Sequence, residues 1–260
     1  MKNYTDINAE TIDSWVSQDW EWGRPVTPEE FARAKKGDWK VVLTPLVEVP
    51  KTWFEPFLEN GRLDGVKLLG LASGGAQQMP IFAALGADCT VLDYSTKQLE
   101  SESMVAQREG YEINIVKADM TKPLPFDAES FDIIFHPVSN VYIEKVAPLW
   151  KECHRILRPG GLLLSGLDNG FNFLFNEYEA PLKIQNTLPF NPLKNPEQME
   201  SLMKDDNGIQ FSHSFDEQIG EQLHAGFALV DAYEDFDDEP VTLEVGYPSY
   251  WATKAVKLPF

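Results

Sequence analysis

Residues Val66 to Gln78 read V-K-L-L-G-L-A-S-G-G-A-Q-Q, an apolar run followed by a cluster of small residues. Its apolar half, up to Leu71, is typical of a buried parallel strand. The small residues 72–76 then predict a tight turn with a helix after it. Small side chains let the backbone approach a ligand closely, and a helix start offers free N–H groups. Such a turn can also serve packing alone, so its meaning depends on the residues that lie at set distances downstream.

Strands and helices alternate after this turn. Short apolar runs predict further strands at 89–93, 111–118, 131–135 and 162–164, and the helices between them cover about 77–85, 95–108 and 146–158. This alternation predicts a parallel sheet with right-handed crossovers. A sixth strand is expected at 227–233, and a last, antiparallel strand at 250–256. We therefore expect an α/β fold with a doubly wound, seven-stranded, mostly parallel sheet and helices on both faces.

Two further segments fall outside this alternation. Residues 1–65 hold five of the seven tryptophans and a helix start, the capping box of Thr27 and Glu30. Such a segment is not expected to fold alone, so it should lie on the sheet domain, residues 66–260. Its tryptophans then serve either as anchors only or as a helical lid over a ligand pocket. Residues 169–213 mix aromatics, prolines and asparagines and predict an insertion after the fifth strand, whereas the acidic residues 234–239 predict a solvated turn.

Composition restricts the partners. The chain carries 22 basic and 41 acidic residues, a formal net charge of −19, which should repel nucleic acids and anionic membrane surfaces. It begins without an apolar signal region and has no apolar run of membrane-spanning length, so we expect a cytoplasmic protein. The two cysteines are far apart and the four histidines lack ligand spacing. Neither a disulfide framework nor a metal site is expected.

Acidic residues end two of the predicted strands. Asp93 follows one apolar run and Asp119 follows the next. Ligands of open α/β sheets bind outside the carboxyl ends of the strands. Asp93 lies 19 residues after Gly74, close to the spacing of about 20 expected of a carboxylate that hydrogen-bonds a ribose. One such acid is usually a cap, but two in register with a small-residue turn indicate a nucleoside-bearing ligand.

The sequence resembles the class I S-adenosylmethionine-dependent methyltransferases, of the small-molecule kind typified by quinone-biosynthesis C-methyltransferases. Five segments between Val66 and Ser165 carry the resemblance in the family's order and spacing: L-L-G-L-A-S-G-G-A, V-L-D-Y-S, K-A-D-M, F-D-I-I-F-H-P and R-I-L-R-P-G-G-L-L-L. The resemblance implies a Rossmann-like fold and S-adenosylmethionine as cofactor, with S-adenosylhomocysteine as product. It implies methyl transfer to a small-molecule acceptor by direct displacement. The acceptor, the methylated atom and the choice between monomer and homodimer stay open.

The resemblance also implies cofactor-binding positions. The turn would hold the methionine part of the cofactor through Ala72, Ser73, Gly74 and Gly75. Asp93 would bind the ribose and Tyr94 would pack on the adenine. Asp119 would accept a hydrogen bond from the adenine amino group, Met120 would donate a backbone N–H beside it, and His136 would lie near the sulfonium or the substrate.

The chain departs from the family pattern in the turn. The acid usual inside the first strand is Gly70, and the first and third glycines of the turn are Ala72 and Ala76. Ser73, Gln77 or Gln78 would then substitute at the amino-acid end of the cofactor. In place of the N-P-P-[YF] tetrapeptide of adenine-methylating enzymes the chain has H-P-V-S-N, which disfavours a nucleic-acid substrate.

Candidate residues for the acceptor side follow from topology. His136 and His213 are the candidate general bases, although the activated methyl group of the cofactor allows a reaction driven by proximity alone. Asn140 and Tyr142 are candidates for orienting the acceptor. Trp22 and Trp39 are candidates for an aromatic wall, because aromatic faces stabilise a nearby cation such as the sulfonium.

Two other functions are compatible with parts of the pattern. A nicotinamide-dependent dehydrogenase would explain G-x-A-x-x-G at residues 70–75 as a distorted dinucleotide fingerprint, but not Asp119 or the antiparallel last strand. A non-catalytic protein of the methyltransferase fold, binding the cofactor or a partner, would explain the altered first-strand acid and glycines.

Overall fold

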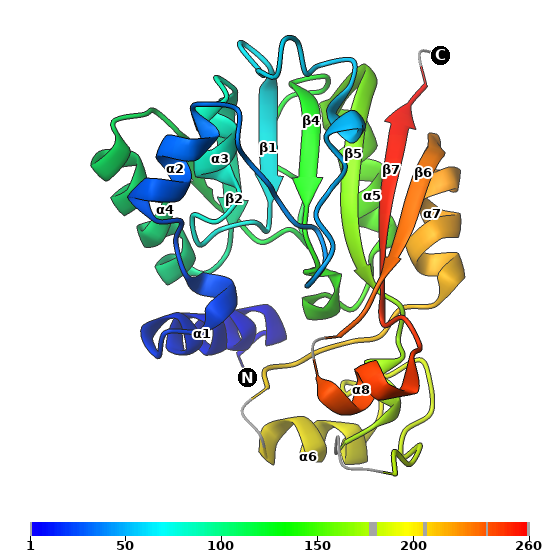
Figure 1. The fold of residues 1–260 in the computed structure, drawn as a ribbon. Helices are drawn as coiled ribbons and strands as arrows, with labels where there is room; N and C mark the ends of the chain where they lie inside the picture. Colours follow the sequence, from blue (N-terminus) through cyan, green and yellow to red (C-terminus); the bar gives the residue numbers. More distant parts are fainter. Residues whose placement is uncertain (1, 177–180, 205–206, 238, 259–260) are drawn as a thin grey trace.

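The computed structural model describes residues 2–176, 181–204, 207–237 and 239–258. Its centre is one sheet of seven strands: β1 (Lys67–Leu71), β2 (Asp88–Asp93), β3 (Asn114–Lys117), β4 (Phe131–His136), β5 (Leu157–Asp168), β6 (Phe227–Asp235) and β7 (Tyr250–Lys257). Their order across the sheet is β3-β2-β1-β4-β5-β7-β6 (Figure 1). β7 pairs antiparallel with both β5 and β6, whereas the pairs between β3, β2, β1, β4 and β5 are parallel. The predicted sheet is confirmed.

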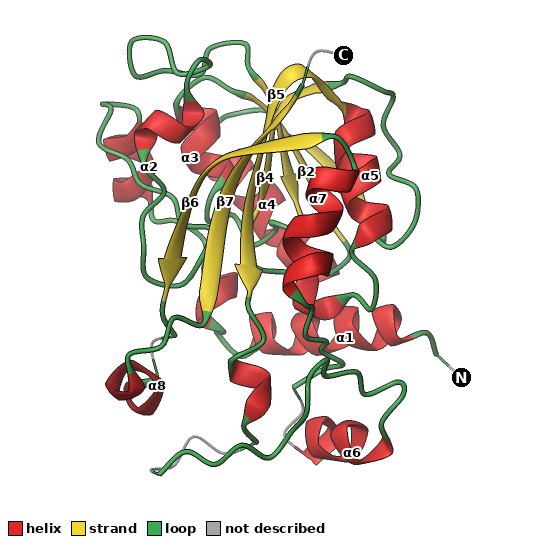
Figure 2. Ribbon diagram, turned by 90° about the vertical axis from the view of Figure 1, so that its right-hand side faces the viewer, coloured by secondary structure: helices red, strands yellow, loops and turns green. Residues whose placement is uncertain are grey.

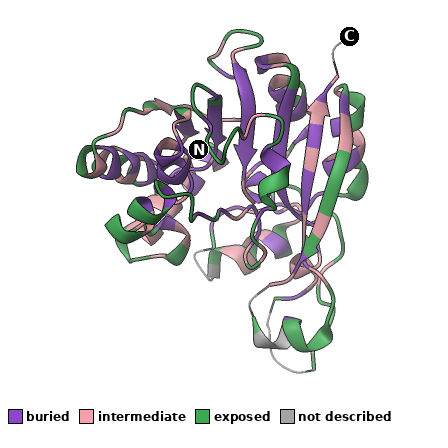
Figure 3. Cartoon of the chain, turned by 45° about the horizontal axis from the view of Figure 1, so that its top comes forward, coloured by how far each residue is buried: buried purple, intermediate pink, exposed green. Residues whose placement is uncertain are grey.

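Helices cover both faces of the sheet (Figure 2). They are α1 (Tyr4–Ser17), α2 (Pro28–Ala34), α3 (Met79–Ala84), α4 (Thr96–Glu109), α5 (Ala147–Ile156), α6 (Pro196–Lys204), α7 (Glu221–His224) and α8 (Pro240–Val245). One apolar cluster joins the sheet to α2, α3 and α4, and the second joins its other face to α5. Because both faces are covered, the central strands are apolar and almost wholly buried (Figure 3).

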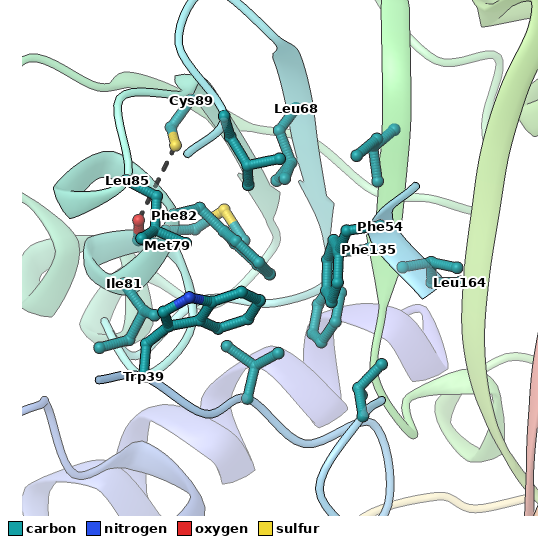
Figure 4. Packing of buried hydrophobic residues seen from close by; sticks show 14 of the residues in the cluster. Trp39, Phe54, Leu68, Met79, Ile81, Phe82, Leu85, Cys89, Phe135 and Leu164 are labelled. Carbon is teal, nitrogen blue, oxygen red and sulfur yellow. Dashed lines mark hydrogen bonds between the residues drawn. The ribbon is translucent and has the colours of Figure 1, made fainter. Parts of the chain in front are cut away.

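Residues 38–63 pack on the sheet, and their buried apolar side chains are part of its core. Trp39 and Phe54 belong to the same cluster as Leu68 of β1 and Phe135 of β4 (Figure 4). Leu63 belongs to this cluster as well. Ring centroids lie 5.4 Å apart between Trp39 and Phe54, in an edge-to-face contact that suits aromatic pairs. These contacts anchor residues 38–63 on the sheet.

The segment after β5 was predicted as an insertion, residues 169–213. It contains the 3-10 turn η4 (Asn172–Leu174) and α6, and with α8 it lies beyond the carboxyl ends of the strands (Figure 1). Residues 177–180 and 205–206 of this range lie outside the described residues.

The acidic segment 234–239 is not the solvated turn predicted from sequence. β6 continues through it to Asp235, whose side chain is fully buried. One carboxylate oxygen of Asp235 accepts hydrogen bonds from the backbone nitrogens of Leu46 (2.8 Å) and Val47 (2.9 Å). These bonds explain how a carboxylate is tolerated there, because buried charges need hydrogen-bond partners. Asp238 lies outside the described residues.

Candidate active site

A cavity of about 700 Å³ opens at the carboxyl ends of β1, β2, β4 and β5. Its size is in the range usual for small-molecule and cofactor sites. The sheet contributes the residues that follow these strands, α1 contributes one wall, and the insertion contributes the opposite wall. Of the site residues predicted from sequence, the cavity wall contains Ala72, Ser73, Gly74, Gln78, Asp93, Tyr94, Asp119, Met120, Tyr142 and Trp22.

The turn after β1 is held in a left-handed conformation. Ala72 has φ +47°, Gly75 +94° and Ala76 +57°. A non-glycine residue is uncommon there, and it costs about 1–2 kcal/mol. A Cβ at Gly74 would lie 2.9 Å from a carboxylate oxygen of Asp93, so position 74 admits only glycine without a shift. Gly75 belongs to the same turn, but its place is behind the cavity wall, where its N–H donates to the Gln98 carbonyl (3.1 Å).

The side chains packed around Gly70 leave no room for the acidic residue that the family usually has in the first strand. A Cβ at this position would lie 2.6 Å from the sulfur of Met79, the first residue of α3. The methionine side chain thus fills the volume that a larger residue would need. The Met79 side chain therefore explains why position 70 is a glycine in this chain, where the family usually has an acidic residue.

The buried carboxyl of Glu102, which the sequence analysis did not single out, holds the turn by a hydrogen bond. Oε1 of Glu102, on α4, accepts a hydrogen bond of 2.7 Å from the backbone N–H of Ala76. Glu102 is fully buried, and this burial raises its pKa to about 8. The carboxyl is therefore largely protonated at neutral pH. The role of Glu102 can be recognised only from the structure, because glutamate is common in helices and nothing in the sequence of α4 sets this one apart.

The two strand-end acids lie on the cavity wall. Asp93 accepts hydrogen bonds from the backbone nitrogens of Gly74 (3.0 Å) and Ser95 (2.9 Å). Burial raises the pKa of Asp93, and these N–H donors oppose the shift. Asp119, just past β3, accepts from the N–H of Thr121 (2.8 Å).

The helix α1 closes one side of the cavity and is tied down at both ends. Beyond the end of β2, Asp13 Oδ1 accepts from Ser95 Oγ (2.5 Å) and from the N–H of Lys97 (2.9 Å), at the start of α4. Toward the insertion, the side-chain amide of Asn8 exchanges hydrogen bonds with the backbone of Ile209 (2.6 and 2.9 Å). Figure 1 shows α1 lying across the strand ends.

The tryptophans of the first 65 residues divide into two groups. Trp15, Trp20 and Trp22 line the cavity. Trp39 and Trp53 do not, because both rings are buried in the core. The expectation that Trp39 contacts the substrate is therefore corrected: its ring packs against Phe54, on the sheet.

On the opposite wall, acidic and polar side chains that the sequence analysis did not single out lie together. Asp168 is the last residue of β5, and Asp237 follows β6. Asn172 donates to Asp237 Oδ2 (2.8 Å) and hydrogen-bonds to Asp168 as well. The hydroxyl of Tyr250 donates to the same oxygen of Asp237 (3.2 Å). Asp168 carries the same signal as Asp93 and Asp119, an acid that ends a strand, and could have been found by it.

Comparison with known proteins identifies the family. Residues 69–165 match the family model described as a methyltransferase domain. The chain is 40% identical over 256 residues to an uncharacterized methyltransferase of Bacillus subtilis, YbaJ, an alignment that covers 96% of this chain and 97% of that protein. The chain belongs to the class I S-adenosylmethionine-dependent methyltransferases.

More distant relatives agree with this assignment. A ubiquinone biosynthesis O-methyltransferase of Caulobacter is 28% identical over 107 residues, 40% of this methyltransferase and 42% of that one. A crystal structure of an S-adenosylmethionine-dependent methyltransferase from Mesorhizobium loti has the same fold, with a TM-score of 0.61 at 20% identity, over 77% of this chain and 93% of the other. The dehydrogenase alternative and the non-catalytic alternative both give way to an enzyme with S-adenosylmethionine as cofactor.

The residues present fit that cofactor. When bound, S-adenosylmethionine supplies a methyl group already activated on a sulfonium. The turn of the methyltransferase offers a close backbone approach at Gly74, and two strand-end carboxylates offer acceptors for hydroxyl and amino groups. Gln98 Oε1, at the cavity wall, is buried without a hydrogen-bond partner among the described residues. A buried unpaired acceptor costs free energy, which a bound ligand can recover.

The two candidate bases of the methyltransferase lie behind the cavity wall. His136 is fully buried; its Nδ1 lies 2.8 Å from the Leu71 carbonyl and its Nε2 lies 2.7 Å from the Asn140 side chain. His213 Nε2 lies 3.0 Å from the Asn140 carbonyl. Burial lowers the pKa of both rings. These histidines and Asn140 do not line the cavity, so their predicted contact with substrate is corrected to a supporting place in the wall.

Membrane-spanning helices and metal clusters are both absent from the part of the chain that the structure describes. No helix in that part is long and apolar enough to cross a lipid bilayer. No group of three or more histidine, cysteine or acidic side chains within the described ranges is arranged to hold a metal ion.

Proposed function

We propose that this cavity binds S-adenosylmethionine and a small-molecule acceptor side by side, and that the enzyme methylates this acceptor. The observation that carries the proposal is the meeting of Gly74, Asp93 and Asp119 on one cavity wall. They come from the ends of three neighbouring strands, β1, β2 and β3. The adenosine lies at this wall, with its ribose at Asp93 and its adenine between Tyr94 and Asp119.

The remaining volume of the cavity takes the acceptor. This part of the cavity is lined by the last residue of β5, Asp168, by Phe173 of the insertion and by the first residue of β7, Tyr250. The family supports methyl transfer as the reaction, and a cavity of about 700 Å³ has the size usual for a site that binds small molecules. The net charge of −19 also disfavours a nucleic acid.

We further propose that α1 is a lid over both ligands. It lines the cavity with Thr5, Ile12 and Trp15, and it bridges the two walls through Asp13 and Asn8. Closure by such a helix excludes water and holds the two reactants in line.

Calorimetry with the full chain tests the cofactor site. We expect S-adenosylmethionine and S-adenosylhomocysteine to bind, and NADH not to bind. Asp93→Asn should weaken S-adenosylhomocysteine about tenfold or more, because it removes the charged acceptor at the ribose. Asp88→Asn, an exposed change at the other end of the same strand, is the matched control. Equal affinities of the two variants would contradict the placement of the ribose.

A further inference from the structure

The cavity wall carries charge of one sign. Four aspartates line it: Asp93, Asp119, Asp168 and Asp237. None of the wall residues that the structure describes is a lysine, an arginine or a histidine. Carboxylates without a counter-ion attract cations and repel anions, and the effect is stronger where water is partly excluded. An acceptor that carries a carboxylate or a phosphate is therefore disfavoured.

Two of these acids lie away from the proposed adenosine wall. Asp168, Asn172, Asp237 and Tyr250 form what we call the acidic subsite. Asn172 joins the two carboxyls, and Tyr250 donates to Asp237. The backbone N–H of Gly170 donates to Asp168 Oδ1 at 2.6 Å. These donors orient the carboxyls, but each of them is neutral, so none of them supplies a counter-ion to the subsite.

Burial of Asp168 makes the lack of a counter-ion among the described wall residues costly. Asp168 is only 4% exposed. Its burial, with the nearby charge of Asp237, raises the pKa of Asp168 to about 7. A bound cation would favour the ionised carboxylates, which is the usual way in which buried acids are stabilised.

The surroundings of the subsite suit an apolar body attached to such a cation. Phe173 and Phe190 line the cavity with ring centroids 5.2 Å apart. Aromatic rings bind apolar groups and attract cations to their faces. Thr5 of α1 is also at the wall, only 7% exposed, and its hydroxyl has no hydrogen-bond partner among the described residues. That hydroxyl is available to a polar group of the ligand.

We propose that the methyl acceptor is a small molecule with an amino group, which is bound as its ammonium ion between Asp168 and Asp237 and anchors the acceptor, with its apolar body against Phe173 and Phe190. A protonated nitrogen has no electron pair to offer, so the methyl group goes to another atom of the acceptor. This inference rests on the proposed function, since it names the substrate class of the same cavity. It assigns the charge and the anchoring group of the acceptor, which the family does not specify.

Calorimetry on the full chain, first saturated with S-adenosylhomocysteine, tests the subsite with three probes of one shape. They are 2-phenylethylamine, 2-phenylethanol and phenylacetate. We expect the amine to bind about tenfold tighter than the alcohol, and the carboxylate to bind more weakly than either. The first titration, of S-adenosylhomocysteine itself, reports separately on the proposed function.

Substitutions of the two aspartates test whether the amine binds at the acidic subsite. Asp168→Asn and Asp237→Asn should each weaken the amine about tenfold and leave the alcohol and S-adenosylhomocysteine unchanged. Asp127→Asn, an exposed change outside the cavity, should alter none of the three affinities. The proposal is wrong if the amine does not bind, if phenylacetate binds as tightly as the amine, or if both subsite variants keep the wild-type amine affinity. Loss of S-adenosylhomocysteine binding in the wild-type protein would instead overturn the proposed function.

Discussion

Oε1 of Glu102 accepts a 2.7 Å hydrogen bond from the backbone N–H of Ala76, and so joins α4 to the turn that lines the cavity. The carboxyl is buried with a pKa of about 8, raised mainly by burial and also by the charge of Asp93. An unfolded glutamate has a pKa near 4.5. The protonated form is therefore favoured by folding, and its contribution to stability is complete below pH 4.5 and lost as pH rises toward 8.

Glu102→Gln keeps the acceptor oxygen and cannot ionise. We expect the free energy of unfolding of this variant, relative to wild type, to rise by up to about 1.4 kcal/mol per pH unit between about pH 5 and 8. Urea unfolding at several pH values measures the difference. Glu100→Gln, an exposed change on the same helix, should show no such slope. Parallel pH curves for wild type and Glu102→Gln would contradict the raised pKa.

Ala72 and Ala76 adopt positive φ angles of 47° and 57° where glycine is the usual residue. Because the left-handed conformation costs alanine about 1–2 kcal/mol, Ala72→Gly and Ala76→Gly should each raise the free energy of unfolding by up to about 1 kcal/mol. Ala106→Gly, in the last turn of α4, should lower it by about 1 kcal/mol. Chemical denaturation measures all three. A loss of stability in both turn variants would show that the alanine methyls pack well enough to offset the strain.

The sequence was sufficient for the sheet and for the cofactor-side wall. Period and spacing are local signals, and the strands of a parallel sheet bring their carboxyl ends to one edge, so Asp93 and Asp119 could be assigned to that edge from their sequence positions alone. The position of Trp39 could not, because a loop residue carries no periodicity that shows whether it faces the core or a cavity. Nor could the burial of Asp235, which depends on backbone donors at Leu46 and Val47, far away in the chain.

The direction of the His136 side chain could not be predicted from the sequence either. His136 is the last residue of β4, one residue further than the strand predicted from sequence, and its ring turns back toward the Leu71 carbonyl instead of into the cavity. Topology places a Cα at a strand end and does not set the side-chain rotamer. Asp168, by contrast, obeys the strand-end rule that located Asp93, and it was missed because the insertion after β5 obscured the end of that strand.

The pKa of His136 is expected to lie below 6.5, the ordinary pKa of the side chain, because burial disfavours the charged ring. The Leu71 oxygen can only accept, so the single ring hydrogen of the neutral side chain lies on Nδ1. Nε2 can then accept only if the Asn140 amide turns its nitrogen toward the ring and away from Gln218 Oε1. Nitrogen NMR of the imidazole should show the Nδ1–H tautomer at about pH 6. A ring that protonates near 6.5 would show instead that water reaches it.

The lid depends on the contact between Asp13 and the start of α4. Asp13→Ala removes the acceptor for Ser95 Oγ and for the N–H of Lys97. Because these bonds hold α1 over the cavity, we expect S-adenosylhomocysteine to dissociate faster and its affinity to fall about fivefold, corresponding to about 1 kcal/mol for a partly exposed charged hydrogen bond. Calorimetry gives the affinity, and limited proteolysis within residues 1–27 reports the opening of the helix.

Glu10→Ala is the matched control for the lid, since Glu10 is exposed on the same helix and pairs only with Lys2 among the described residues. It should change neither the affinity nor the rate of cleavage. If Asp13→Ala bound S-adenosylhomocysteine as wild type while α1 was cleaved faster, the helix would open without consequence for the ligand. In that case α1 would serve only to cover the apolar strand ends.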